Sequence, residues 1–302
     1  MKKLITKTTL FLFPIFILLV SFEYLLRSIP NDYSYKKKYL DDNAEKLEVL
    51  ILGNSHASYG INPDFIHLAA FNNSHGSQTI DYDYQIFQKY FDKLTRLKYI
   101  ILPIDYFTLF IRLENGWEEY RKKYYNIYYG MCFGSTPDNY LEILNNKFSL
   151  NLKRVWMFYI RKKTLRNCNN NGSATFNQEQ KKFFLNNGKY RAAIYTSKTK
   201  KNLLSSIEIL DKFIAKAYSI KTKVILLTMP AEHSYIKYLN SEQLYTTIHL
   251  AENFAAKYPN VKYYNLINNT RFVNGDFFDS DHLNEKGAKK LSMKLDSIIK
   301  RF

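Results

Sequence analysis

The chain has few of the residues that disulfide-bonded, fibrous or disordered proteins contain in excess. Its 302 residues include only two cysteines, ten glycines and seven prolines. The cysteines, Cys132 and Cys168, are too few for a disulfide framework or a four-thiolate zinc site, although they can pair or stay free. With 46% hydrophobic residues, the chain is neither collagen-like nor disordered, and it is long enough to bury a sizeable core.

Motifs for metal and nucleotide binding are also missing. No His-x₃-His or cysteine pair occurs at ligand spacing, so no metal or other cofactor is expected. No glycine-rich loop follows the first predicted strand, which argues against a phosphate-binding α/β protein. Acidic residues are scarce, and the net charge of +17 predicts an anionic partner. No nucleic-acid motif accompanies this charge, so nucleic acid is not the expected partner.

The N-terminal residues 1–29 predict a membrane anchor. Three lysines precede an apolar run at residues 8–26, which just reaches the roughly 18–20 residues that a helix needs to cross a bilayer. No A-x-A site follows, which favours an uncleaved signal anchor over a cleaved signal peptide; a buried helix would not need the lysines. These lysines predict a cytoplasmic N-terminus with residues 30–302 outside, whereas the lysines at 36–38 oppose that orientation.

The remaining chain alternates between strand and helix patterns. Strands are predicted at residues 47–52, 70–72, 98–104, 223–228 and 261–266, and helices at 79–96, 203–218, 241–258 and 284–299. A further helix is predicted to start at Asn62-Pro63-Asp64. This alternation predicts an α/β domain with about five parallel strands, and ligands of such sheets bind at the carboxyl ends of the strands.

Residues 105–202 interrupt this alternation and are predicted to be an insertion. Residues 151–201 contain thirteen lysines and arginines against one acid, Glu179. Such a segment is either a solvated basic surface or a platform for an anionic glycan, a lipid headgroup or phosphate.

Two short motifs contain the residues of a nucleophilic site. Gly53-Asn54-Ser55-His56 follows the first strand, and a serine in such a turn is exposed and has a backbone N–H beside it. Asp279-Ser280-Asp281-His282 precedes the last helix, where an acid three residues before a histidine can orient its ring. Each motif alone has a structural alternative: the first is a common turn, and the acids of the second can cap the helix.

Together, the two motifs resemble those of the SGNH/GDSL hydrolase superfamily. The resemblance implies a flavodoxin-like three-layer α/β/α fold and ester chemistry through Ser55 as nucleophile, His282 as base and Asp279 as its orienter. Judged from the residues alone, Asp281 is an alternative orienter, although an acid directly adjacent to His282 points less easily at its ring. The resemblance also implies an oxyanion hole formed by the N–H groups of Ser55 and Gly76. The family's Gly-x-Asn-Asp block is replaced by Pro103-Ile104-Asp105, so Asn73 or Gln78 is the expected side-chain donor, or the hole has backbone donors alone.

The anchor, the basic insertion and the many aromatic residues are similar to the membrane-tethered branch of that superfamily. This branch includes D-alanine transfer proteins and periplasmic acetyltransferases, which implies an envelope glycan or lipid as substrate. Hydrolysis and acyl transfer both remain open. A transferase would need a multi-pass membrane acyltransferase as partner, because one helix cannot carry acyl groups across a bilayer. The alternative function is a non-catalytic SGNH-fold protein that binds an anionic polymer. His56, His75 and His233 are lesser candidates, and His56 is expected to be a polar loop residue.

Overall fold

The computed structural model describes residues 1–144, 146–176 and 187–302, so a small part of the predicted insertion lies outside the described residues. The chain divides into two compact units. Unit 1 comprises Met1–Lys38 and Trp117–Asn167, and unit 2 comprises Tyr39–Gly116 and Cys168–Phe302. Cys132 is exposed in unit 1 and Cys168 is buried in unit 2, and both are free thiols.

Unit 2 is built on a five-stranded parallel sheet, as the alternation of patterns predicts. The strand order is β2-β1-β3-β4-β5, so the chain starts near the middle of the sheet and winds outward in both directions. The strands begin and end close to their predicted limits: β1 (Val49–Ile51), β2 (Ala70–Asn72), β3 (Tyr99–Pro103), β4 (Lys223–Thr228) and β5 (Val261–Asn265).

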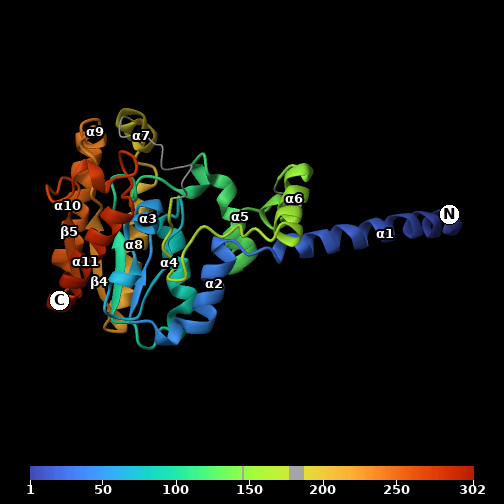
Figure 1. The fold of residues 1–302 in the computed structure, drawn as a ribbon, viewed down its shortest axis with the longest axis horizontal. Coiled ribbons are helices and arrows are strands. Elements are labelled where there is room, and N and C mark those ends of the chain that lie inside the picture. Colours follow the sequence, from blue (N-terminus) through green and yellow to red (C-terminus); the bar gives the residue numbers. More distant parts are fainter. Residues whose placement is uncertain (145, 177–186) are drawn as a thin grey trace. The chain divides into compact units, whose positions relative to one another are not determined.

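Helices cover both faces of this sheet, which gives three layers (Figure 1). One face packs against α3 (Ser55–Gly60) and α11 (Glu285–Arg301) through alternate strand residues such as Ile51, Ile101 and Ile225. The opposite face is covered by α4 (Ile80–Tyr90), α8 (Leu203–Ser219) and α10 (Ser241–Lys257). The predicted α/β fold class is therefore confirmed.

The helix that follows β1 differs from the prediction. It begins at Ser55, whereas Asn62-Pro63-Asp64 starts only the 3-10 turn Pro63–Phe65. Asn54 caps the first helix, and the residue before Pro63 is held extended (φ −104°, ψ 111°), which separates the two turns. Ser55 is therefore the first residue of a helix rather than part of a loop.

Unit 1 consists of helices and turns. It contains α1 (Lys2–Arg27), α5 (Lys122–Tyr124) with the π-helical turn Tyr125–Tyr129, and α6 (Phe148–Val155), which continues as the π-helical turn Trp156–Ile160. The helix α2 (Asp32–Asn43) leads the chain from unit 1 into unit 2. Most of α1 is exposed, and it is long and apolar enough to cross a membrane.

The remaining described elements are short. Two helices of unit 2 belong to loops at the carboxyl end of the sheet, α7 (Gly188–Tyr195) and α9 (His233–Ile236). The 3-10 turns lie at Ala44–Lys46, Pro63–Phe65, Phe91–Lys93, Leu113–Asn115, Glu119–Arg121, Pro137–Asn139 and Asn274–Asp276. The predicted limits of the anchor and of the insertion remain predictions.

Candidate active site

Ser55 lies at the tight turn between β1 and α3, at the carboxyl end of the sheet. Gly53 makes the turn with a φ of +112°, which L side chains rarely adopt, and a Cβ there would lie 3.0 Å from Pro103 Cδ. Asn54 caps α3 by accepting the backbone N–H of His56 at 2.8 Å. The turn leaves Ser55 half-buried at the start of the helix.

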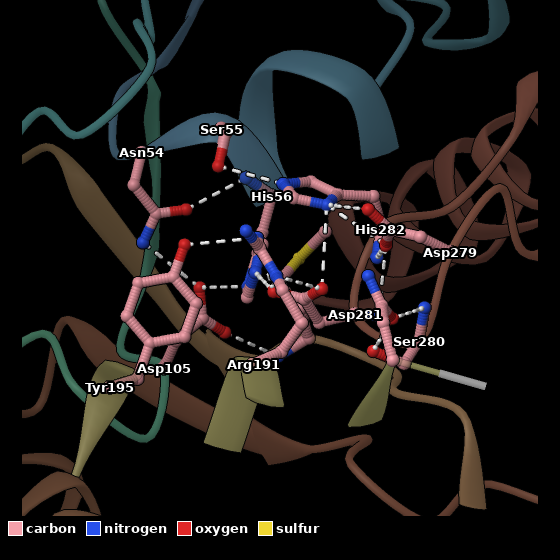
Figure 2. Close-up of polar contacts among 12 residues, drawn as sticks. Asn54, Ser55, His56, Asp105, Arg191, Tyr195, Asp279, Ser280, Asp281 and His282 are labelled. Atoms are coloured by element: carbon pink, nitrogen blue, oxygen red, sulfur yellow. Dashed lines mark hydrogen bonds and ion pairs between the residues drawn. The ribbon is translucent and has the colours of Figure 1, made fainter. Parts of the chain in front are cut away.

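His282 and Asp279 come from the loop between β5 and α11. His282 Nε2 lies 2.9 Å from Ser55 Oγ, and both carboxylate oxygens of Asp279 lie 3.0 Å from His282 Nδ1. Because an ionised carboxylate only accepts hydrogen bonds, Nδ1 carries the ring proton, and Nε2 can accept the Ser55 hydroxyl proton (Figure 2). The structure thus brings the predicted nucleophile, base and orienter within hydrogen-bond distance of one another.

Asp279 is held in place by the backbone of its own loop. Its Oδ1 accepts the N–H groups of Asp281 and His282 at 3.0 and 2.7 Å. Asp281 itself lies farther from the base, with Oδ1 3.6 Å from His282 Nδ1. The closer contact identifies Asp279 as the acid that orients the ring of His282.

Asp281 instead faces His56, the residue after the nucleophile. His56 Nε2 lies 3.1 Å from Asp281 Oδ2, and His56 Nδ1 lies 3.0 Å from Asp105 Oδ2 (Figure 2). Since both ring nitrogens face carboxylates, both donate, and the ring carries a positive charge. Burial would lower the pKa of His56, but the two carboxylates raise it to about 10. His56 is therefore a buried imidazolium and not the polar loop residue expected from the sequence.

Arg191 adds a second cation to this network. Its Nε and Nη2 donate to the two carboxylate oxygens of Asp281, both at 2.8 Å, and Nη2 also donates to Tyr195 Oη at 3.0 Å. Burial would raise the pKa of Asp281, but His282, His56 and Arg191 hold it well below its usual range. Two cations and two carboxylates are thus balanced beside the candidate triad.

Helix α7, on which Arg191 lies, clamps the loop of the base at two points. Besides the Arg191–Asp281 pair, Ser280 Oγ donates to Asn187 Oδ1 at 2.6 Å, just before the helix starts. Gly188 allows α7 to approach α9, because a Cβ there would lie 2.2 Å from the carbonyl carbon of Ser234. A segment of the basic insertion therefore fixes the loop that contains His282.

Asp105 occupies the position at which the resemblance predicts the Gly-x-Asn-Asp motif, and its carboxylate binds Asn54 and His56, on either side of Ser55. Its Oδ2 accepts from Asn54 Nδ2 at 3.1 Å as well as from His56. Its Oδ1 accepts the backbone N–H of Met229, at the end of β4, at 3.0 Å. Three strand ends are linked through this one carboxylate, so Asp105 has a structural task in this chain.

Sequence reasoning did not identify this network. Arg191 is one of thirteen similar cations in its segment, and nothing in the sequence marks it. His56 and Asp105 are 49 residues apart, and Arg191 and Asp281 are 90 residues apart. The one usable signal was the adjacency of His56 to Ser55.

The loop after β2 lies beside the turn of the nucleophile. The backbone N–H of His75 donates to the Gly53 carbonyl at 3.1 Å, and Gly76 follows in a half-buried turn. Ser77 then adopts a φ of +57°, which turns the chain back toward α4. This contact brings the segment of the expected oxyanion donor Gly76 next to the segment of Ser55.

The two expected side-chain donors, Asn73 and Gln78, are both buried. The backbone N–H of Asn73 donates to Ile51 O at 2.8 Å. Gln78 Nε2 donates to Asp83 Oδ1 at 2.6 Å and to Asn73 O at 3.4 Å, so a role as oxyanion donor would require breaking these bonds. Asp83 Oδ1 also accepts the Gly53 N–H at 2.8 Å. Burial raises the pKa of Asp83 to about 7 although these donors oppose the shift.

Aromatic rings line one side of the base. Phe176 stacks on Tyr59 and on Phe278, with centroids 4.0 and 3.5 Å apart. Tyr59 and Phe176 each meet the ring of His282 edge-on, at centroid distances of 5.7 and 6.3 Å. This stack gives the site an apolar wall, which suits an acyl chain or the face of a sugar ring.

Among the described residues, one group of side chains has metal-ligand spacing. Ligand atoms of His56, Asp281 and His282 lie within 4.8 Å of one another. All three already bind protein groups, and a metal ion would have to displace the guanidinium of Arg191 from Asp281. The donor set is that of a hydrogen-bond network, and the absence of a cofactor stays a prediction.

Comparisons with known proteins place the chain in no family. No protein-family model matches it, and no curated protein matches its sequence. Two solved structures align over most of its length. A Bacteroides fragilis protein provisionally described as an acylhydrolase is 10% identical, with a TM-score of 0.42 over 87% of this chain and 95% of that one. A GDSL-like lipase from Bacteroides thetaiotaomicron is 12% identical, with a TM-score of 0.42 over 89% of this chain and 98% of that one.

Proposed function

We propose that this chain is a serine enzyme of the SGNH/GDSL type that acts on an acyl ester. The observation that supports it is the contact of Ser55 Oγ with His282 Nε2 at 2.9 Å, where Asp279 orients the ring. A serine hydroxyl is a weak nucleophile unless a neighbouring base takes its proton, and this arrangement supplies that base.

The reaction proceeds in two steps. His282 takes the proton from Ser55 as Oγ attacks the ester carbonyl, and the N–H groups of Ser55 and Gly76 stabilise the tetrahedral oxyanion. His282 then gives its proton to the leaving alcohol, and an acyl-serine remains. His282 next takes the proton of an acceptor O–H as that oxygen attacks the acyl-serine, and it returns the proton to Ser55 Oγ as the acyl–Oγ bond breaks. The acceptor is water in a hydrolase and a sugar hydroxyl in a transferase.

The network around His56 positions the two reacting loops. His56 follows the nucleophile directly, and its partner Asp281 precedes the base, so the ion pair joins the two segments. Arg191, on α7, adds a second cation that donates to the carboxylate of Asp281. The task of these residues is to hold Ser55 and His282 at hydrogen-bond distance before substrate binds, which lowers the entropic cost of reaction.

We further propose that α1 is an uncleaved anchor and that the enzyme acts outside the cytoplasm on an envelope glycan or lipid. Glu23, near the end of α1, accepts the backbone N–H groups of Glu142 and Ile143 at 3.0 and 2.8 Å. Arg27 donates to Tyr140 O at 2.6 Å. Cleavage after α1 would remove the partners of these backbone groups, which supports its retention. In the transfer reaction, a multi-pass membrane acyltransferase supplies the acyl group.

The test is turnover of p-nitrophenyl acetate by the full chain in detergent, beside Ser55→Ala and His282→Ala. We expect both variants to lose turnover, and a fluorophosphonate probe to label the parent but not Ser55→Ala. Added glycan acceptors then separate the two reactions, because a transferase forms acylated glycan and a hydrolase releases free acid. Unchanged turnover in both variants would refute the triad, and a parent with neither turnover nor labelling would favour the non-catalytic polymer-binding protein.

A further inference from the structure

Unit 1 exposes a row of large apolar side chains on α6 and the π-helical turn that continues it. They recur at every fourth position and are about half exposed: Phe148 (60%), Leu152 (47%), Trp156 (55%) and Ile160 (58%). Off this row, Asn151 is fully buried and packs the helix against the rest of unit 1, whereas Leu150 is also exposed (48%). Exposed apolar surface of this extent, on a helix whose other side is packed, marks an interaction surface.

Basic side chains flank this apolar row. Residues 147–163 contain six lysines and arginines and no acid. Arg154 pairs with the buried Glu142 at 2.9 Å. The other five have no ion pair within the described parts of the chain: Lys147, Lys153, Arg161, Lys162 and Lys163. A helix with an apolar face and uncompensated cations is typical of segments that lie in the interface of a membrane.

This helix contacts α1 close to the end of the apolar run. The rings of Phe148 and Phe22 lie 5.5 Å apart, and Tyr159 Oη donates to Leu25 O at 3.0 Å. Figure 1 shows α6 beside this end of α1, while the rest of α1 extends away from it. A helix of 26 residues is about 39 Å long, and a bilayer's hydrocarbon core is about 30 Å thick. The contact therefore falls where a spanning helix leaves the hydrocarbon.

We propose that residues 147–163 form a membrane-contact helix, which lies in the interface of the bilayer that α1 crosses. Phe148, Leu152, Trp156 and Ile160 enter the boundary between acyl chains and headgroups, and the flanking cations bind the phosphates of anionic phospholipids. Trp156 occupies a position that tryptophan favours in membranes. The inference rests on α1 as a membrane span and is independent of the ester chemistry.

The charge pattern favours lipid over a second copy of the chain. A symmetric dimer through this helix would bring two sets of uncompensated cations together, with no acid in residues 147–163 to pair with them. At the boundary of a bilayer, anionic headgroups would pair with the cations while the adjacent acyl chains contact the apolar side chains. One bilayer surface thus satisfies both features of the helix.

The two tryptophans of the chain provide the test. Trp117→Phe leaves Trp156 as the only tryptophan, and Trp156→Phe leaves Trp117, an exposed residue of the same unit that is followed by two glutamates. Each variant of the full chain is reconstituted in phosphatidylglycerol–phosphatidylcholine vesicles. We expect lipid brominated near the headgroup end of its acyl chain to remove roughly half of the Trp156 emission. Trp117 should respond to aqueous acrylamide and not to brominated lipid.

A second variant tests the charges. In the Trp117→Phe background, glutamine replaces Lys153, Arg161, Lys162 and Lys163. Quenching of Trp156 in the unaltered helix should increase with the phosphatidylglycerol fraction, and the glutamine variant should lose this dependence while its quenching in phosphatidylcholine is retained. If quenching of Trp156 in the glutamine variant still increases with the phosphatidylglycerol fraction, the proposal that these cations bind anionic headgroups is overturned.

Three further outcomes would overturn the proposal. Trp156 that acrylamide quenches as strongly as Trp117, with no response to brominated lipid, would show a solvated helix. Trp156 protected from both quenchers would show that protein covers it, as in a dimer. Extraction of the chain from the vesicles by carbonate would refute both the anchor and the membrane-contact helix. A chain that resists carbonate, but whose Trp156 is quenched by acrylamide or protected from both quenchers, would refute the membrane-contact helix alone.

Discussion

Asp279 and Asp281 lie two positions apart on one loop, and we expect their amide variants to fail in different ways. Asp279→Asn keeps an oxygen for the backbone N–H groups of Asp281 and His282 but can present the wrong group to the His282 ring. In a serine triad, this change lowers kcat by about 10⁴ while the fold is retained. The urea midpoint of this variant should stay close to that of the parent chain.

Asp281→Asn removes a buried negative charge, whereas the tautomer of His282 is still set by Asp279. Its carboxylate is fully buried between His56 and Arg191, and its loss breaks the ion pair of Arg191 and leaves His56 paired with Asp105 alone. Breaking a buried pair by removing one partner costs about 3–5 kcal/mol. With a urea dependence of about 2–3 kcal/mol per molar, the midpoint of unfolding should fall by roughly 1–2 M. Turnover of the folded fraction should decline far less than in Asp279→Asn.

Both variants are measured in the full chain in detergent, by p-nitrophenyl acetate turnover and by urea titration. A normal rate for Asp279→Asn beside a large kcat loss for Asp281→Asn would reverse the assignment and make Asp281 the orienter. An unchanged urea midpoint for Asp281→Asn would show that the buried charges are not balanced as described.

Three other changes have defined outcomes. Asp83 has a pKa of about 7 in the folded chain, above its ordinary value of 3.8, so the free energy of unfolding should fall by a few kcal/mol as the pH rises from about 4 to 7. Asp83→Asn should remove this fall, which thermal melts at pH 5 and pH 8 would measure. Gly172 has a φ of +85° and a Cβ there would lie 2.1 Å from Asn72 O, so Gly172→Ala should lower Tm clearly, whereas Gly275→Ala, with nothing within 4 Å, should not. Arg191→Lys loses the two-point contact with Asp281 and should lower the urea midpoint by part of the Asp281→Asn effect; equal midpoints for Arg191→Lys and the parent would contradict it.

The fold could be predicted because its signals are local. The three central strands, β1, β3 and β4, are short apolar runs, and residues 70–72 and 223–228 form strands with the predicted limits. The two segments of the candidate triad could also be located, since Ser55 and His282 each follow a strand, and the carboxyl ends of parallel strands meet at one edge.

The partners of the triad depend on contacts that no local pattern encodes. His56 next to Ser55 has the composition of a polar loop, and only the fold brings Asp105 and Asp281 to its two nitrogens. The start of α3 also differs from the prediction. Asn62-Pro63 is a strong helix-start pattern and does start a turn, whereas the helix itself starts eight residues earlier, at the cap Asn54, whose amide also donates to Asp105.

Within unit 1 the sequence indicates α1 by its apolar run, whereas α5 and α6 are short, each continues as a π-helical turn, and neither is predicted. Trp156–Ile160 continues α6 with a wider turn, so apolar residues at every fourth position stay on one side. The sequence shows that this segment is rich in cations, but only the structure shows that Asn151 is buried while the apolar row is exposed.

The separation of Ser55 from His282 has a consequence for the time at which activity arises. The nucleophile precedes the base by 227 residues, and the buried pair of His56 with Asp281 spans almost the same distance along the chain. At about 5–20 residues per second, a ribosome needs roughly 10–45 s to add that stretch. On the proposed mechanism, Ser55 has no base throughout this interval, so the nascent chain has no esterase activity. On that mechanism, activity therefore arises only after His282 is added, later than β5, the last strand of the sheet.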